Sequence, residues 1–119
     1  MIQTTKNQNK RYDLEDRTKK FALEVRGFVR SISKFQSFED DIKQLIRSSG
    51  SIGANYIEAN ESLSRKDFLM RVKICRKEAK ETIYWLELIV SDLPQKLQLI
   101  KEATELMKIF GAIISKSEV

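Results

Sequence analysis

The 119-residue chain contains no histidine and only one cysteine. Histidine is the commonest general base near neutral pH and the commonest transition-metal ligand, and structural zinc sites draw four ligands from cysteine and histidine. The Glu-x-x-His units of di-iron bundles are missing for the same reason. We therefore expect no catalytic residue, no metal ion and no other cofactor.

Two other patterns give only weak indications of phosphate binding or catalysis. The segment GSIGAN at 50–55 has the glycines of a phosphate-binding loop, but no Lys-Ser or Lys-Thr follows it. Glu58, Glu78 and Glu81 could act as acid–base groups, although carboxylates on helices more often form ion pairs or lie in solvent. The sequence predicts a non-enzymatic protein without a small-molecule substrate.

Turn-forming residues and long apolar runs are also scarce. Four glycines and one proline offer few turns for a protein built from many short strands. No run approaches the roughly 18 apolar residues that span a bilayer, and residues 1–13 lack the apolar segment of a signal peptide. A single cysteine fits a reducing compartment, and the position of Cys75 in an apolar series indicates core packing rather than a reactive thiol. We expect an all-α, cytoplasmic protein without membrane contact.

What the chain does contain is four stretches in which apolar side chains recur at alternating steps of three and four residues. The first stretch comprises Leu14, Thr18, Phe21, Val25, Phe28, Ile32 and Phe35. The second comprises Ile42, Leu45, Ser49, Ile52, Tyr56 and Ala59. The third comprises Phe68, Val72, Cys75, Ala79, Thr82, Leu86 and Ile89, and the fourth Leu99, Ala103, Leu106, Phe110 and Ile113. Because such spacing keeps one stripe of a helix facing the same way, the sequence predicts an up-down-up-down antiparallel four-helix bundle.

Capping signals predict where these helices begin. The first helix is expected to begin near Asp13, the second after Ser37 as N-cap, and the third after Ser64 as N-cap. The third should continue to about Ser91. Pro94 then suits the first turn of the fourth. We divide the chain into a flexible polar arm at 1–11, the bundle at 12–115 and a C-terminal tail at 116–119.

The second helix contains Gly50 and Gly53 among small residues. Glycine inside a helix is costly, so either the helix breaks here or a neighbouring helix approaches closely enough to use the missing side chains. We favour the close approach.

More apolar residues lie beside the seams than one small bundle shelters easily. They are Leu23, Ile46, Ile57, Leu69, Ile74, Ile83, Leu88, Val90, Met107, Ile109 and Ile114. Leaving many of them in water would be unfavourable, because burial of each is worth roughly 1.5 to 3 kcal/mol. We expect self-association, although scattered surface apolar residues are common singly.

Basic residues form two rows, and the chain has a net charge of +5. One row on the first helix comprises Lys19, Arg26, Arg30 and Lys34, and one on the third comprises Lys66, Lys73, Lys77 and Lys80. Either row could follow a nucleic-acid backbone. The alternative is an ordinary solvated face whose field is diluted by Glu24, Glu78, Glu81 and Glu87.

Two segments resemble a known family. The chain resembles the bacterial four-helix-bundle proteins encoded in intervening sequences of large-subunit ribosomal RNA genes. The similar segments are IRSSGSIGANYIEANESLSRKDF and KICRKEAKETIYWLEL. The resemblance extends to accessory proteins of diversity-generating retroelements, which bind nucleic acid. It implies a bundle that assembles into rings, typically pentamers, and it implies no catalysis.

The resemblance also assigns roles to single positions. It implies that Asn55, Glu58, Arg76 and Glu81 make polar pairs inside or between subunits, and that Phe68 is an apolar anchor. Where other members carry Gly after this Arg, the present chain has Lys77 followed by Glu78, which makes its surface more charged.

Two functions follow from these observations. The first is a ring-forming, non-enzymatic bundle that associates with RNA or DNA through its basic rows. The second is a protein-interaction scaffold whose apolar faces bind a partner helix, with no role for nucleic acid.

Overall fold

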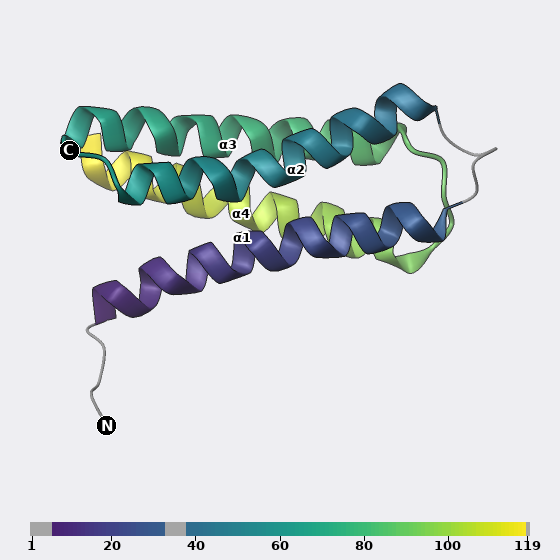
Figure 1. Ribbon diagram of the computed structural model, residues 1–119, viewed down its shortest axis with the longest axis horizontal. Helices are drawn as coiled ribbons and strands as arrows, with labels where there is room; N and C mark the ends of the chain where they lie inside the picture. Colours follow the sequence, from purple (N-terminus) through teal and green to yellow (C-terminus); the bar gives the residue numbers. More distant parts are fainter. Residues whose placement is uncertain (1–5, 33–37, 119) are drawn as a thin grey trace.

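The computed structural model describes residues 6–32 and 38–118. These residues form four helices, α1 (Lys6–Ser31), α2 (Glu39–Asn60), α3 (Arg65–Leu88) and α4 (Pro94–Glu118), and the described ranges contain no strand. Each helix runs antiparallel to the one before it (Figure 1). The predicted all-α, up-down-up-down bundle is therefore confirmed.

The first two helices begin at other residues than expected. α1 begins at Lys6 rather than near Asp13, because the polar segment between them contains no Gly or Pro and is rich in good helix formers. The N-cap of α2 is Phe38, which makes no side-chain capping bond, whereas Ser37 lies outside the described residues. Acidic residues in the first turn favour this helix start through the helix dipole.

The start of α3 is predicted correctly. The Ser64 side chain caps the helix by accepting a hydrogen bond from the Asp67 backbone N–H at 3.1 Å. α3 ends at Leu88, before the expected Ser91, and Ile89 after it adopts an extended conformation.

The fourth helix begins at the residue that the sequence indicated. Pro94 opens α4, as expected, since its missing N–H needs no partner in the first turn. α4 then continues to Glu118, which is beyond the bundle boundary expected at 115.

The four apolar seams meet in one core. Most seam residues are buried, and Leu14, Ile32, Ile42, Phe68 and Ile113 are half-buried against them. At the end of α4, Ile114 is buried as well, although the spacing placed it beside the seam. The helices surround this core, and the N-terminal end of α1 diverges from the bundle (Figure 1). Within the described ranges, no helix combines the length and apolarity that a membrane-spanning segment needs.

The glycines of α2 mark a close approach of two helices. α2 is unbroken, and a Cβ added at Gly53 would lie 2.9 Å from the Thr18 Oγ1 of α1. Thr18 is 1% exposed, and its hydroxyl donates a hydrogen bond to the Leu14 carbonyl at 2.7 Å. Gly53 therefore lets α1 and α2 pack backbone to side chain, as the small-residue pattern predicted.

Candidate nucleic-acid interface

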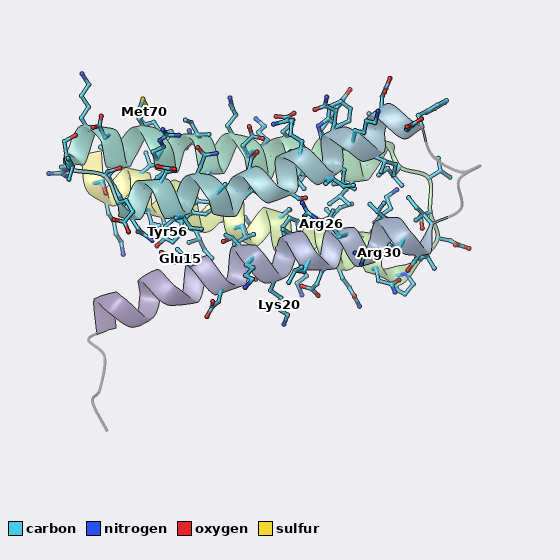
Figure 2. All side chains as sticks on the ribbon, viewed as in Figure 1. Glu15, Lys20, Arg26, Arg30, Tyr56 and Met70 are labelled. Atoms are coloured by element: carbon cyan, nitrogen blue, oxygen red, sulfur yellow. The ribbon has the colours of Figure 1, made fainter. Side chains whose placement is uncertain are left out.

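The basic row of α3 lies on the solvent side of the bundle. Lys66, Lys73, Lys77 and Lys80 are all exposed. Met70 belongs to the same face and points away from the other helices (Figure 2). The sequence spacing therefore placed these four lysines correctly, on one exposed helix face.

Three of these lysines border a hollow between α3 and α4. A cavity of about 430 Å³ is lined by Lys73, Arg76, Lys77 and Lys80 of α3 and by Met107 of α4. No acidic residue of the described chain lines it. Lys77, Lys80 and Arg76 form no ion pair with any described residue. The result is a hollow with basic side chains and an apolar floor.

A second hollow continues the row toward the start of α3. It has a volume of about 540 Å³ and is lined by Arg65, Lys66, Asp67, Leu69, Met70 and Lys73. Lys73 borders both hollows, so the basic surface extends along most of α3. Asp67 is the one carboxylate among the described residues lining this second hollow.

Two acidic residues of α3, Glu78 and Glu81, lie on the side that faces α2. Arg47 of α2 places its Nη1 3.3 Å from a Glu78 carboxylate oxygen, and its Nη2 donates to the Glu81 carboxylate. Glu78 is only 7% exposed, so its charge is neutralised inside the α2–α3 interface. Two of the four acidic residues expected to dilute the field of the lysines, Glu78 and Glu81, are thus paired with Arg47.

Glu81 is further held by an aromatic donor. The indole Nε1 of Trp85 donates a hydrogen bond to its carboxylate at 3.2 Å. Burial opposes ionisation of Glu81, but the hydrogen bonds from Trp85 and Arg47, aided by the charges of Arg47 and Lys77, outweigh it and lower the pKa of Glu81. Glu81 is therefore a stably ionised partner of Arg47.

Two acidic residues of α4, Glu102 and Glu105, are paired on another side of the bundle. Glu102 accepts two hydrogen bonds from the Arg17 guanidinium of α1, at 2.7 and 2.8 Å. Glu105 lies 3.6 Å from the same guanidinium. Both carboxylates therefore belong to the α1–α4 side of the bundle, and the α3–α4 side keeps an excess of positive charge.

The basic row expected on α1 is not continuous in the structure. Lys19 and Arg30 are exposed, but Arg26 is half-buried and donates to the Ala22 carbonyl at 3.0 Å. Its guanidinium lies beside Gly50 of α2, on the side of α1 that faces α2 (Figure 2). Lys34 lies outside the described residues. Of the four cations expected in this row, two are thus exposed among the described residues, whereas all four lysines of the α3 row are exposed.

The positions marked by the family resemblance divide into paired and unpaired residues. Asn55 accepts a hydrogen bond from Arg71 at 3.1 Å and joins α2 to α3, and Glu81 is paired with Arg47. Arg76 instead lines the α3–α4 hollow, and an added Cβ at Gly111 would lie 3.9 Å from its Cδ.

Glu58 is the remaining polar position that the family resemblance marks. The side chain of Glu58 is exposed. The described part of the chain contains no cluster of three or more His, Cys, Asp or Glu that would suit a metal ion.

Sequence reasoning missed the cations that anchor these acids. Arg17, Arg47 and Arg71 pair with residues far away in the chain. The available signal was the position of Glu78 beside the α3 seam, because a carboxylate so close to the core needs a cationic partner.

Cys75 is a core residue, as expected. Its side chain is fully buried and its Sγ lies 3.4 Å from the Ile52 carbonyl oxygen. Burial raises the pKa of the Cys75 thiol to about 12. The thiol is therefore protonated near neutral pH and unsuited to nucleophilic chemistry.

Comparisons with known proteins agree with this architecture. A family model described as "23S rRNA-intervening sequence protein" matches residues 10–112. The chain is also similar to a crystal structure from Bacteroides thetaiotaomicron VPI-5482, described as a protein with unknown function from the S23 ribosomal protein family. That similarity has 34% sequence identity and a TM-score of 0.75, and covers 85% of this chain and 97% of the other. A comparison with curated proteins found no match. Because the family model spans most of the bundle, the chain belongs to the 23S rRNA-intervening sequence protein family.

Proposed function

We propose that the protein is a non-enzymatic, self-associating bundle that binds RNA or DNA through the basic face of α3. The observation that carries this proposal is the α3–α4 hollow, which is bordered by four cations and by no described acidic residue. Nucleic-acid affinity grows with the number of phosphates that basic side chains neutralise. A row of exposed cations on a rigid helix supplies that kind of contact.

The sorting of charge supports this choice over an ordinary solvated face. Glu78 and Glu81 are paired with Arg47, and Glu102 and Glu105 with Arg17. These acids neutralise cations on the other two sides of α3 and α4. Arg76, Lys77 and Lys80 thereby remain without an ion-pair partner among the described residues, on a surface that a phosphate backbone can reach.

The family context also favours RNA. The family description names intervening sequences of 23S rRNA, and the similar crystal structure is assigned to a ribosomal protein family. Neither description names a ligand of this chain, so the proposal depends on the charge distribution.

Self-association is proposed from the apolar residues that the bundle leaves outside. Phe38, Val90 and Leu97 are exposed at the end where α2 and α4 begin, and Ile57 and Leu63 at the opposite end. We propose a homo-oligomeric ring, with five subunits as the expected number. In such an assembly the basic face is repeated, and weak contacts of one subunit add up through avidity.

The binding test is a charge reversal with a matched control. Lys73→Glu, Lys77→Glu and Lys80→Glu together should abolish binding to fluorescently labelled structured RNA and to duplex DNA at about 50 mM salt. Lys20→Glu, Lys43→Glu and Lys101→Glu make the same change in net charge on other surfaces and should reduce binding much less. Unmeasurable binding of every nucleic acid, single-stranded or duplex, by the unmodified protein would contradict the proposal, and so would equal losses of affinity in both variants.

The assembly is tested separately by light scattering coupled to size-exclusion chromatography. We expect a closed oligomer at micromolar concentration. A monomer at all concentrations would overturn the ring.

A partner-helix scaffold is the second candidate function. Exposed Ile57, Leu63 and Met70 near the α2–α3 link favour it, because apolar side chains near a helix pair suit an amphipathic partner helix. The two candidates separate cleanly, since the lysine reversals should leave binding of a partner helix intact.

A further inference from the structure

An exposed aromatic residue lies at the end of the basic row. Tyr84 is 54% exposed and follows Lys80 by one helical turn. Lys73, Lys77, Lys80 and Tyr84 are separated by steps of four, three and four residues, so they share one face of α3. The Tyr84 backbone is about 6 Å beyond that of Lys80 along the helix axis.

The Tyr84 ring packs against the Trp85 ring of the same helix. Its centroid lies 5.0 Å from that of Trp85, with an interplanar angle of 72°. Trp85 is in turn fixed by its hydrogen bond to Glu81, which Arg47 of α2 holds from the other side. Because an edge-to-face pair uses at most one face of a ring, Trp85 leaves at least one face of Tyr84 uncovered.

A basic row that ends on such a ring suits a particular class of nucleic acid. In a duplex, the bases are stacked on one another and offer no flat face to a side chain. In a single strand, the phosphates can follow a positive groove while an unstacked base packs on an aromatic ring. We infer that the α3 surface binds single-stranded nucleic acid, with phosphates near Lys77 and Lys80 and a base stacked on Tyr84. This inference rests on the proposed function and adds the strand state of the ligand.

The first test compares ligands on the unmodified protein. A labelled, unstructured single-stranded RNA should bind more tightly than a duplex RNA with the same number of nucleotides, and a single-stranded DNA arm shows whether the sugar matters. Trp85 is the only tryptophan of the chain, so stacking beside it should change its fluorescence on binding the single strand. The duplex should leave that fluorescence nearly unchanged.

The second test changes the ring without changing charge. Tyr84→Leu should weaken single-strand binding roughly 5- to 150-fold, the range expected for loss of one stacked base. Tyr84→Phe should retain nearly full affinity, because stacking needs the ring and not the hydroxyl. Gln98→Ala changes an exposed, uncharged side chain on the α1–α4 side of the bundle and should have no effect. The slope of log affinity against log salt should be equal in all variants, since no phosphate contact is removed.

The outcomes separate the two proposals. If neither a single strand nor a duplex binds, the proposed function fails and this inference fails with it. If the duplex binds as tightly as the single strand, with no Trp85 response and no effect of Tyr84→Leu, only the assignment of a single strand fails. The Trp85 measurement uses the unmodified chain and therefore decides the matter even if a variant folds poorly.

Discussion

Charged side chains on the two sides of α3 differ in whether they are paired within the chain. On the side facing α2, Glu78 and Glu81 are satisfied by Arg47 within the chain. On the side facing α4, Arg76 and Lys80 border a hollow without a described acidic neighbour in its lining. The first arrangement stabilises the fold, whereas the second brings like charges close together, with no ion pair for Arg76 or Lys80 among the described residues.

This difference shows why composition alone describes the surface poorly. α3 has a mixed sequence of lysines and glutamates, which reads as an ordinary solvated helix. Once the helices are packed, Glu78 and Glu81 pair with Arg47 of α2, whereas Arg76, Lys77 and Lys80 border the α3–α4 hollow. Charge that no intramolecular contact uses is available for a ligand, and substitutions on the two sides should therefore have opposite consequences for stability and binding.

The largest contrast is expected from removing one arginine on each side. Arg47→Ala should lower the free energy of unfolding by about 2 kcal/mol, because it leaves the Glu78 carboxylate buried without a cation. Arg76→Ala should change it by less than about 0.5 kcal/mol, since Arg76 forms no ion pair among the described residues. Urea denaturation at a fixed protein concentration measures both. Equal losses would mean that the two sides of α3 do not differ.

A second contrast compares a glycine at the α1–α2 contact with a glycine at the α3–α4 contact. Gly53→Ala should destabilise the protein by about 1 to 2 kcal/mol, because the new Cβ would lie 2.9 Å from the Thr18 Oγ1 and 3.2 Å from its Cβ. Gly111→Ala meets only the Arg76 Cδ at 3.9 Å, and it should stabilise the protein by up to about 1 kcal/mol through helix propensity. Thermal denaturation should show midpoints displaced in opposite directions. Two shifts of the same sign would show that the α1–α2 contact is no tighter than the α3–α4 contact.

The bundle itself could be predicted from the sequence because helix packing depends on periodicity. The three- and four-residue steps identified nearly every core residue, and local chemistry at Ser64 and Pro94 identified two helix starts. The start of α1 at Lys6 escaped prediction because a polar segment can extend a helix beyond its apolar stripe. The end of α3 at Leu88 also escaped prediction, because the apolar spacing continues through Ile89, whose backbone is extended.

The sequence predicted the exposed lysines of the site but not the contacts that other charged side chains make between helices. Spacing places a residue on a face of its own helix but does not say which helix lies beside that face. The partner of Arg47, Glu78, is 31 residues away, so the pair depends on the register of α2 against α3. For the same reason Arg26 was grouped with exposed cations, although its guanidinium lies against α2. Lys66, Lys73, Lys77 and Lys80 were placed correctly because an outward face needs no knowledge of neighbours.

A smaller effect on stability is expected from acidic pH, which protonates Glu81 on the side of α3 that faces α2. The folded structure lowers the pKa of Glu81 below its ordinary value of 4.5. Ionised Glu81 therefore adds stability above the pKa that it has in the unfolded chain, and this contribution is lost as pH falls through the lower, folded pKa. Replacing Glu81 by Gln should make stability less dependent on pH below about 5, by less than about 1 kcal/mol for so accessible a pair. Urea midpoints measured at several acidic pH values test this.

The control for the pH effect is Glu81→Gln in a chain that lacks the Arg47 cation. In an Arg47→Ala background, Glu81→Gln should alter the pH dependence much less, because one of the groups that stabilise the carboxylate is already gone. An undiminished effect would assign the pKa shift to Trp85 instead of the α2 side.

The smallest change in stability, with a clear change in binding, is expected from neutralising single lysines. Lys80→Gln should leave the free energy of unfolding within about 0.5 kcal/mol and lower the slope of log affinity against log salt by about 0.7 to 0.9, the value of one phosphate contact. Lys43→Gln is the matched control, because Lys43 lies on α2 and is 3.7 Å from the Glu39 carboxylate. It should leave the salt slope unchanged. Salt slopes reduced equally by both substitutions would mean that the protein attracts nucleic acid by net charge alone, and the α3–α4 hollow would then lose its special role.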